Sequence, residues 1–294
     1  MKTIGLFNPS SPSYDPIDMA SLKKWFEQKG FQIKESPNLF SYDRFLSGTD
    51  FERASDLMTL FKDKNVDLLV ALKGGYGSAR ILDLLDFETI SKNKKPLMGF
   101  SDTTALQLGL WAKCGLKSWT GLSPRRDVAK TTPTDKMLEK SFDVYIKEGS
   151  MSLNLQSLSS DHPNVSGVLI GGTLSLVSEL IGTPYQPNFK GCLLFLEDVM
   201  EEPYKIDRML TQLRLAGVFN EVSGVIFGDF YKCISEDEND GNITEVLMDL
   251  AERIPQTPMW TGLPYGHSDT RIILPIGNEA KIESNTLSFS YKLL

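Results

Sequence analysis

The feature that most constrains the fold of this chain is the alternation of strand and helix patterns before residue 115. Apolar runs that end in turn residues occupy 3–12, 31–36, 66–77 and 95–100. Helical spacing of apolar residues occupies 21–30, 50–65, 78–87 and the segment after Ser101. Strands that alternate with helices predict an α/β fold with a doubly wound, mostly parallel sheet.

The second half of the chain predicts a further α/β unit. The stretch 123–163 is polar and carries one weak helical pattern near 134–147. We therefore expect an N-terminal α/β domain over 1–155 and a C-terminal α/β domain of mixed sheet over 156–294. Apolar runs at 166–172, 190–198, 222–230 and 258–266 predict its strands, and 279–294 alternates like an exposed antiparallel hairpin. Between the second and third runs, Ile206, Met209, Leu210 and Leu213 follow the spacing of an amphipathic helix.

Charge and cysteine content exclude several classes of protein. The net charge is −7, whereas a nucleic-acid partner requires a basic face. Three cysteines, at 114, 192 and 233, form no CxxC pair, so neither a disulfide framework nor a zinc site is indicated. No apolar stretch reaches the length of a membrane span, and the N-terminal apolar run is too short for a secretory signal. These features predict a soluble cytoplasmic protein with no membrane partner.

Three side chains suited to nucleophilic catalysis follow apolar runs. The chain has two histidines, His162 in a polar turn, where a solvated role is expected, and His267 after "GLPYG". Ser101 follows "PLMGF" and Glu197 follows "CLLFL". In open α/β sheets the functional groups lie beyond the carboxyl ends of strands. A serine needs an imidazole to take its proton, and the imidazole needs a carboxylate to orient it.

Each of these residues also has an ordinary structural interpretation. Ser101 alone is more often a helix N-cap, and it lacks the second glycine of the G-x-S-x-G elbow. Glu197 alone is more often a solvated acid, with Asp198, Glu201 and Glu202 as rivals. An oxyanion hole would also be required, and the backbone N–H groups of Asp102 and of Gly75, in "KGGYG", are candidates.

The sequence resembles the LD-carboxypeptidase family of serine peptidases, which includes muramoyl-tetrapeptide carboxypeptidases and microcin C self-immunity proteins. The matching stretches are 71–86, 96–106, 167–187, 191–213 and 262–277. The resemblance implies a two-domain α/β fold, a triad of Ser101, Glu197 and His267, and backbone oxyanion donors at Asp102 and Gly75. The chain departs from the family pattern at Lys73, where we expect arginine, at Thr173, where asparagine is commoner, and over 118–130.

The resemblance also implies a function. We expect a serine carboxypeptidase that forms an acyl-enzyme on Ser101 and releases the terminal D-alanine of a murein tetrapeptide, with no metal or organic cofactor. Arg125, Arg126 and Arg271 are candidates to bind the carboxylate of the substrate, and Tyr76 is a further candidate to contact it. The family further implies a homodimer.

Two alternatives stay open. The first is a self-immunity peptidase that cleaves peptidyl or aminoacyl nucleotide conjugates, with Trp119 as the nearest residue that could stack on adenine. The second is a bilobal binding protein that has kept the cleft without turnover. A broken triad would favour the second alternative.

Overall fold

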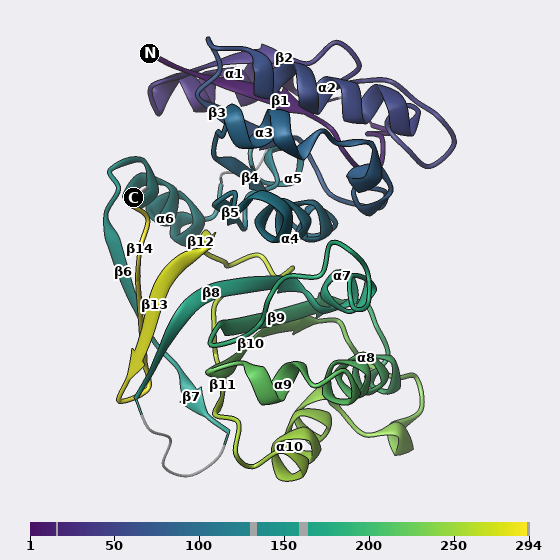
Figure 1. The fold of residues 1–294 in the computed structure, drawn as a ribbon, viewed down its shortest axis with the longest axis vertical. Coiled ribbons are helices and arrows are strands. Elements are labelled where there is room, and N and C mark those ends of the chain that lie inside the picture. Colours follow the sequence, from purple (N-terminus) through teal and green to yellow (C-terminus); the bar gives the residue numbers. More distant parts are fainter. Residues whose placement is uncertain (16, 130–133, 159–163, 293–294) are drawn as a thin grey trace.

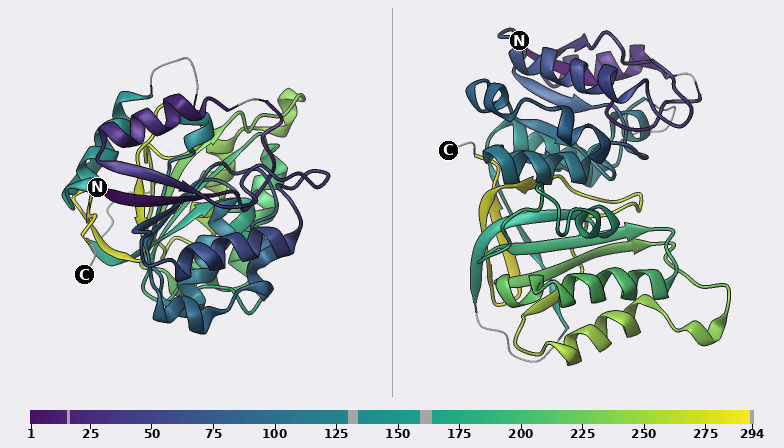
Figure 2. Two further views of the ribbon diagram at one scale, coloured as in Figure 1. Left: turned by 90° about the horizontal axis from the view of Figure 1, so that it is seen from above. Right: turned by 45° about the vertical axis from the view of Figure 1, so that its right-hand side comes forward.

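Two β-sheets, one above the other, organise the chain (Figure 1). The structure, a computed structural model, describes residues 1–15, 17–129, 134–158 and 164–292. The first sheet is mostly parallel and the second is mixed, which confirms the predicted α/β fold. Figure 2 shows the N-terminal half stacked on the C-terminal half in a second orientation. His162 lies outside the described residues, so its expected solvated role stays a prediction.

The first sheet has a reversal of strand order near its middle. Its strands are β1 (Lys2–Phe7), β2 (Phe31–Glu35), β3 (Leu68–Ala71), β4 (Leu97–Gly99), β5 (Ser118–Thr120) and β12 (Leu274–Ile276). They pair in the order β12-β5-β4-β3-β1-β2, and every pair is parallel except β12 with β5. Because the direction of winding reverses between β1 and β3, the crevice at their carboxyl ends is the expected place for a ligand.

The helices of this half follow the predicted spacing, with one change of type. They are α1 (Met19–Gln28), α2 (Asp50–Lys62), the 3₁₀ helix η1 (Ala79–Leu84), α3 (Phe87–Lys92), α4 (Thr103–Cys114), α5 (Pro124–Asp127) and α6 (Lys136–Ile146). Thr49 and Glu52 form a capping box that starts α2. The segment 78–87, predicted as one helix, is divided between η1 and the start of α3.

The second sheet combines a parallel centre with antiparallel edges. Its strands are β6 (Ser150–Asn154), β7 (Gln156–Ser157), β8 (Val165–Thr173), β9 (Leu193–Val199), β10 (Gly224–Tyr231), β11 (Met259–Thr261), β13 (Asn278–Glu283) and β14 (Thr286–Ser290). They pair in the order β6-β14-β13-β8-β9-β10-β11-β7. The hairpin β13–β14 alternates as predicted, and its inward residues are buried, so it is half-buried rather than exposed.

Helices of the second half pack beside this sheet. They are α7 (Leu174–Glu179), α8 (Pro203–Leu215), α9 (Val218–Glu221), the 3₁₀ helix η2 (Glu238–Asp240) and α10 (Ile243–Arg253). In α8 the residues Ile206, Leu210 and Leu213 are buried, as their spacing predicts. None of the helices in the described part of the chain is long and apolar enough to cross a membrane.

Two strands cross the predicted division of the chain. β6 precedes residue 155 but pairs in the second sheet, and β12 follows it but pairs with β5 of the first. Helix α4 lies between the halves and contacts both α7 and β8, which explains why all its residues from Thr103 to Leu110 are buried (Figure 1). The division at 155/156 itself stays a prediction.

Candidate active site

Ser101 occupies a tight turn between β4 and α4. Its φ is +63°, a left-handed conformation that is costly for a residue with a side chain. An added Cβ on Gly99 would come within 2.4 Å of Thr103 Oγ1, so glycine is needed where β4 ends. The N-cap of α4 is Asp102, and Ser101 Oγ instead lies 2.9 Å from His267 Nε2. Ser101 is therefore not the cap of this helix, and its hydroxyl faces an imidazole.

His267 is held in place by its loop. Gly266 forms a parallel bridge with Asp229 of β10, and an added Cβ on Gly266 would lie 2.8 Å from the Asp229 carbonyl oxygen. The strand β11 ends at Thr261, so this bridge rather than β11 itself positions the histidine. The ring packs 4.6 Å from that of Phe100, and its Nδ1 lies 2.7 Å from Glu197 Oε2.

Glu197 is fully buried on β9 and is shared by two partners. Its Oε2 faces His267, while its Oε1 accepts a hydrogen bond of 2.6 Å from the Thr173 hydroxyl. Both oxygens of this carboxylate are thus fixed. Thr173 is one of the departures from the family pattern. It holds the carboxylate oxygen of Glu197 that points away from the imidazole.

The neighbouring acids have other partners. Asp198 accepts hydrogen bonds of 2.8 Å from the Ser175 and Val199 backbone N–H groups. Burial, together with the nearby Glu197, raises the pKa of Asp198 to about 6. Glu201 and Glu202 pair with Lys205 at 3.8 and 3.1 Å. Of the four acids considered, Glu197 is the one that contacts His267.

The loop after β3 packs tightly against the Ser101 turn. An added Cβ on Gly74 would lie 3.0 Å from Ser101 Cβ and 3.3 Å from the Asp102 backbone nitrogen, so only glycine allows this approach. Gly75 has φ +121° and lines the same cavity as Ser101. The two backbone groups predicted as oxyanion donors thus belong to segments in contact.

The Asp102 carboxylate joins these segments. It accepts hydrogen bonds from the backbone N–H groups of Gly77 and Ser78 at 3.1 and 2.9 Å, and from the Ser10 hydroxyl at 2.5 Å. The Ser78 hydroxyl also donates, to the Asp102 backbone carbonyl. Burial raises the pKa of Asp102 against the effect of these donors. One buried side chain therefore ties the glycine loop to the turn that carries Ser101.

A cavity of about 480 Å³, here called the Ser101 cavity, opens above Ser101 and His267. It lies at the carboxyl ends of β1, β3 and β4, next to the reversal of strand order. Its wall carries the cationic side chains of Lys73, Arg125 and Arg126 and the acid Asp15. In a chain of net charge −7, this wall is locally cationic.

Comparison with known proteins shows the family of this chain. A family model described as the LD-carboxypeptidase N-terminal domain matches residues 4–121, and one described as the C-terminal domain matches 166–282. A probable murein peptide carboxypeptidase of Bacillus subtilis (strain 168) is 33% identical over 288 residues, covering 97% of this chain and 89% of that protein. The chain belongs to the LD-carboxypeptidase family. It is therefore a hydrolase of the carboxypeptidase class.

Two further proteins are similar to nearly the whole of this chain. The crystal structure of a muramoyltetrapeptide carboxypeptidase from Oxalobacter formigenes superimposes with a TM-score of 0.88 at 27% identity, and 98% of each chain is covered. The microcin C7 self-immunity protein MccF of Escherichia coli is 25% identical over 321 residues, covering 98% of this chain and 92% of that protein.

Arg271 of this LD-carboxypeptidase lies beneath the site, contrary to its predicted contact with substrate. The side chain is 1% exposed, and its guanidinium donates to the Asp127 carboxylate at 2.5 Å, to Gly121 O at 2.7 Å and to Ser268 O at 3.2 Å. It also packs 4.8 Å from the Phe100 ring. Arg271 therefore supports the loop that carries His267. Its partners are distant in sequence, so local patterns could not reveal them.

The other residues predicted to contact substrate lie in three places: the core, the surface and the cavity wall. Trp119 is fully buried against Tyr145 and cannot stack on a nucleobase. Tyr76 is exposed and packs on Phe45 beside the loop of Gly75. Arg125 donates to Ser13 Oγ at 2.9 Å, and Arg126 donates to the carbonyl oxygen of His267 at 2.5 Å. Arg125 and Arg126 therefore line the cavity, and Trp119 belongs to the core.

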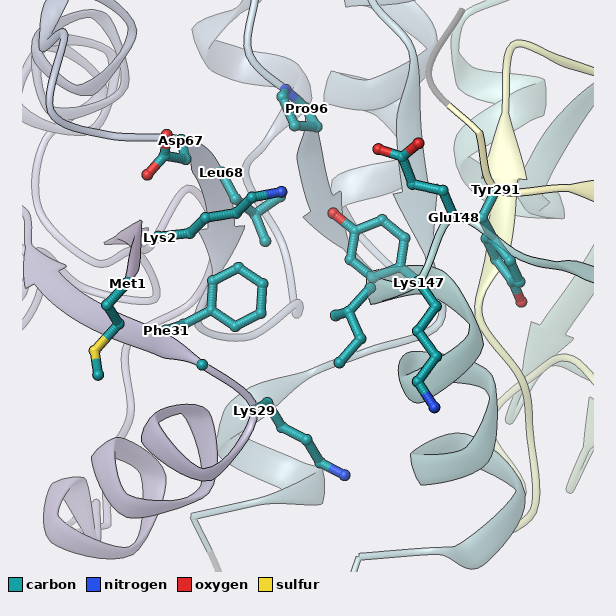
Figure 3. Close-up of a pocket in the computed structure, with 13 residues that line it drawn as sticks. Met1, Lys2, Lys29, Phe31, Asp67, Leu68, Pro96, Lys147, Glu148 and Tyr291 are labelled. Atoms are coloured by element: carbon teal, nitrogen blue, oxygen red, sulfur yellow. The ribbon is translucent and has the colours of Figure 1, made fainter.

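A second cavity, of about 560 Å³, lies at the opposite edge of the first sheet (Figure 3). We call it the amino-edge cavity because its wall includes Met1 and Lys2 at the start of β1. Lys29 in this wall pairs with Glu139 at 2.9 Å and Asp143 at 2.7 Å. It contains neither Ser101 nor His267.

Proposed function

We propose that this LD-carboxypeptidase is a serine hydrolase with the triad Ser101, His267 and Glu197, and that it releases the terminal D-alanine of a murein tetrapeptide. One observation carries the proposal: Ser101 Oγ, the two nitrogens of His267 and Glu197 Oε2 form a continuous chain of 2.9 and 2.7 Å contacts. This is the relation of nucleophile, base and orienting acid that serine hydrolases require.

In the first step Ser101 Oγ attacks the carbonyl carbon of the L,D amide bond. His267 Nε2 takes the serine proton as the new C–O bond forms, and Glu197 holds the Nδ1–H side of the ring and stabilises the imidazolium. The carbonyl oxygen becomes an oxyanion, for which we assign the Asp102 and Gly75 backbone N–H groups as donors. Asp102 follows Ser101 directly in the chain, and Ser101 itself has a left-handed backbone conformation. The proposed nucleophile and this proposed donor therefore belong to the same turn.

In the second step the amide C–N bond breaks. His267 gives its proton to the leaving nitrogen, so D-alanine departs as the amine and the acyl group stays on Ser101. Water then attacks the acyl-enzyme, with His267 again accepting a proton, and the shortened peptide leaves as a carboxylic acid. Each protonation uses the same imidazole nitrogen, and the triad returns to its starting state. None of these steps calls on a metal or organic cofactor.

The cationic wall favours a substrate with a free terminal carboxylate. Arg125 has five N–H donors and Lys73 has three, more than they use on Ser13 Oγ and Pro12 O and in the 3.7 Å ion pair of Arg125 with Asp15. Burial and the neighbouring Arg125 lower the pKa of Lys73, and a bound carboxylate would relieve this repulsion. We therefore assign Lys73 and Arg125, with Arg126 beside them, to the carboxylate of the leaving residue.

The nucleotide-conjugate alternative has weaker support. Its relative MccF shares the fold, but the stacking residue predicted for it, Trp119, is buried in the core. A binding protein without turnover is also disfavoured, because the three triad side chains are already in contact. The homodimer and the cytoplasmic location stay predictions.

The test is release of D-alanine from a disaccharide-linked murein tetrapeptide, followed by mass spectrometry. We expect the wild-type protein to release it and Ser101→Ala to lose at least about 10³-fold in rate. Ser123→Ala is the matched control, because Ser123 lines the same cavity and should keep nearly full activity. Equal release by wild type and Ser101→Ala would remove Ser101 from the mechanism, and no release by wild type would refute the substrate.

A further inference from the structure

The nucleophile and the acid of the proposed triad come from different sheets. Ser101 follows β4 of the first sheet, and Glu197 lies on β9 of the second. The imidazole of His267 contacts both residues, over 2.9 and 2.7 Å. Catalytic groups have to be held within about 0.5 Å of their working geometry. The contacts that fix the Ser101 turn relative to the second sheet therefore matter to the site.

Thr104 joins helix α4 to the end of strand β8. The helix and the strand meet between the two halves of the molecule (Figure 1). The Thr104 side chain is fully buried, and its hydroxyl oxygen accepts a hydrogen bond of 3.2 Å from the Thr173 backbone N–H. An added Cβ on Gly172 would lie 2.4 Å from Thr104 Oγ1, so glycine before Thr173 allows this approach. The hydrogen bond thus fixes the first turn of α4 to the carboxyl end of β8.

Thr104 is also bonded to the turn that carries the nucleophile. Its backbone N–H donates to the Ser101 carbonyl oxygen at 2.8 Å, which closes the left-handed turn. On the other side, Thr173 pairs in register with Glu197 across β8 and β9, and its hydroxyl donates to Glu197 Oε1 at 2.6 Å. Thr104 is therefore one hydrogen bond from the nucleophile turn and two from the acid.

The preceding residue, Thr103, offers a direct comparison. It lies on the same turn of α4 and is also fully buried. Its hydroxyl has no hydrogen-bond partner among the residues that the structure describes. The same substitution at these two threonines therefore separates the loss of a hydrogen bond from the loss of a buried hydroxyl.

We infer that Thr104 is a positioning residue: its hydroxyl fixes Thr173, and through it Glu197, relative to the turn that carries Ser101. The inference rests on the triad of the proposed function and on no particular substrate. The hydrogen bond keeps the Glu197 carboxylate against Nδ1 of His267, so its loss should slow attack by Ser101.

The first test measures the reactivity of Ser101 without a murein substrate. Ser101 Oγ displaces fluoride from a small fluorophosphonate while His267 takes the serine proton, and mass spectrometry of the intact protein follows the adduct. We expect Thr104→Val, which keeps the shape and removes the acceptor, to react about tenfold more slowly. Thr104→Ser returns the oxygen and should regain most of the rate. Thr103→Val is the matched control and should stay within about twofold of wild type.

The second test asks whether the effect passes through Thr173. Thr104→Val added to Thr173→Val should slow labelling no further than Thr173→Val alone, because the hydroxyl that holds Glu197 is already lost. Proton NMR gives a signature of the contact itself. The Nδ1–H of His267, bonded to Glu197, should give a downfield resonance, in a chain with two histidines. We expect Thr104→Val to move that resonance upfield and Thr103→Val to leave it in place.

Three results would overturn the inference. They are equal labelling rates for Thr104→Val and Thr103→Val, additive losses in the double variant, and an unchanged resonance in Thr104→Val. The proposed function fails in a different way. A wild-type protein that is not labelled and shows no downfield resonance would refute the triad, and the inference with it. Labelling of wild type without release of D-alanine would refute the substrate and leave the inference standing.

Discussion

The two cavities at opposite edges of the first sheet differ in what their polar groups do. In the amino-edge cavity, Lys29 is neutralised by Glu139 and Asp143, and Asp67 accepts the Thr3 N–H at 2.7 Å. In the Ser101 cavity, a hydroxyl, an imidazole and three cationic side chains line one space, and within the described part of the chain Arg125 and Arg126 form only longer ion pairs, with Asp15 at 3.7 Å and Asp269 at 3.8 Å. The amino-edge cavity is the larger of the two in volume. Convergence of polar groups, rather than volume, is therefore the reason for choosing the Ser101 cavity as the candidate active site.

The largest difference should appear between one substitution in the Ser101 cavity and one in the amino-edge cavity. We expect His267→Ala to lower kcat about 10⁴-fold or more, because it removes both the base and the acid of the mechanism. Lys147→Ala, in the wall of the amino-edge cavity, should stay within about twofold of wild type. D-alanine release under saturating substrate checks both. A comparable loss in Lys147→Ala would break the contrast between the two cavities.

The next effect concerns the link between the glycine loop and the Ser101 turn. Asp102→Asn replaces one acceptor oxygen by a donor and weakens the bonds to Gly77 and Ser78 N–H. We expect about a 10²-fold loss of kcat with little change of KM, the size of losing one oxyanion donor. Asp56→Asn is the control, because Asp56 is also buried and accepts two bonds from Asn38. If both variants lose activity to the same extent, and that loss follows their lowered Tm, Asp102 has no positioning role.

A smaller effect is expected from the contact that orients Glu197. Thr173→Val removes the hydroxyl that donates to Oε1 and keeps the shape of the side chain. A bond to an ionised carboxylate contributes about 1.5–3 kcal/mol, so we expect kcat to fall at least about tenfold. Thr173→Ser should restore most of the rate, because it returns the donor. Steady-state kinetics with all three proteins check this, and an inactive Ser variant would point to lost packing instead.

The smallest effect on activity is expected beside the triad, at Asp198. Its folded pKa, about 6, lies above the ordinary 3.8, so the folded state holds the proton more strongly. Wild type should therefore lose stability relative to Asp198→Asn as pH rises from about 4 to about 6, by roughly 3 kcal/mol in total. Urea unfolding at about pH 4 and about pH 7 measures this, with Glu201→Gln as the control. A difference that is independent of pH would contradict it.

Local sequence predicted the strands that lie in clear apolar runs, including the three-residue β4 and β11, and missed several others. The strands β5 and β12 have three residues each, too few for a period to show. Helix α10 was also missed, although Asn242 and Glu245 form a capping box before an amphipathic pattern. The capping box could have been recognised in the sequence. The pairing of β12 with β5 could not, because it depends on a contact between distant segments.

The same division applies to the site. The contacts of His267 with Ser101 and Glu197 were expected from the apolar runs before these residues and from the family resemblance, since the runs alone left the acids next to Glu197 as rivals. The carboxylate of Asp102 could not, since its partners Ser10, Gly77 and Ser78 come from other loops. Arg271 was assigned to substrate because arginine often binds carboxylates, but a buried partner, Asp127, occupies it. Sequence reasoning brought together side chains that follow strands, and it missed contacts that depend on a partner distant in sequence.

The return of β12 to the first sheet has a consequence for motion. His267 lies between β11, which belongs to the second sheet, and β12, which belongs to the first. A hinge that swung the two halves apart would have to tear β12 from β5 or stretch the loop that carries the imidazole. The crossing of β12 thus ties the two halves together, and two separately expressed halves would leave β5 paired with β4 alone.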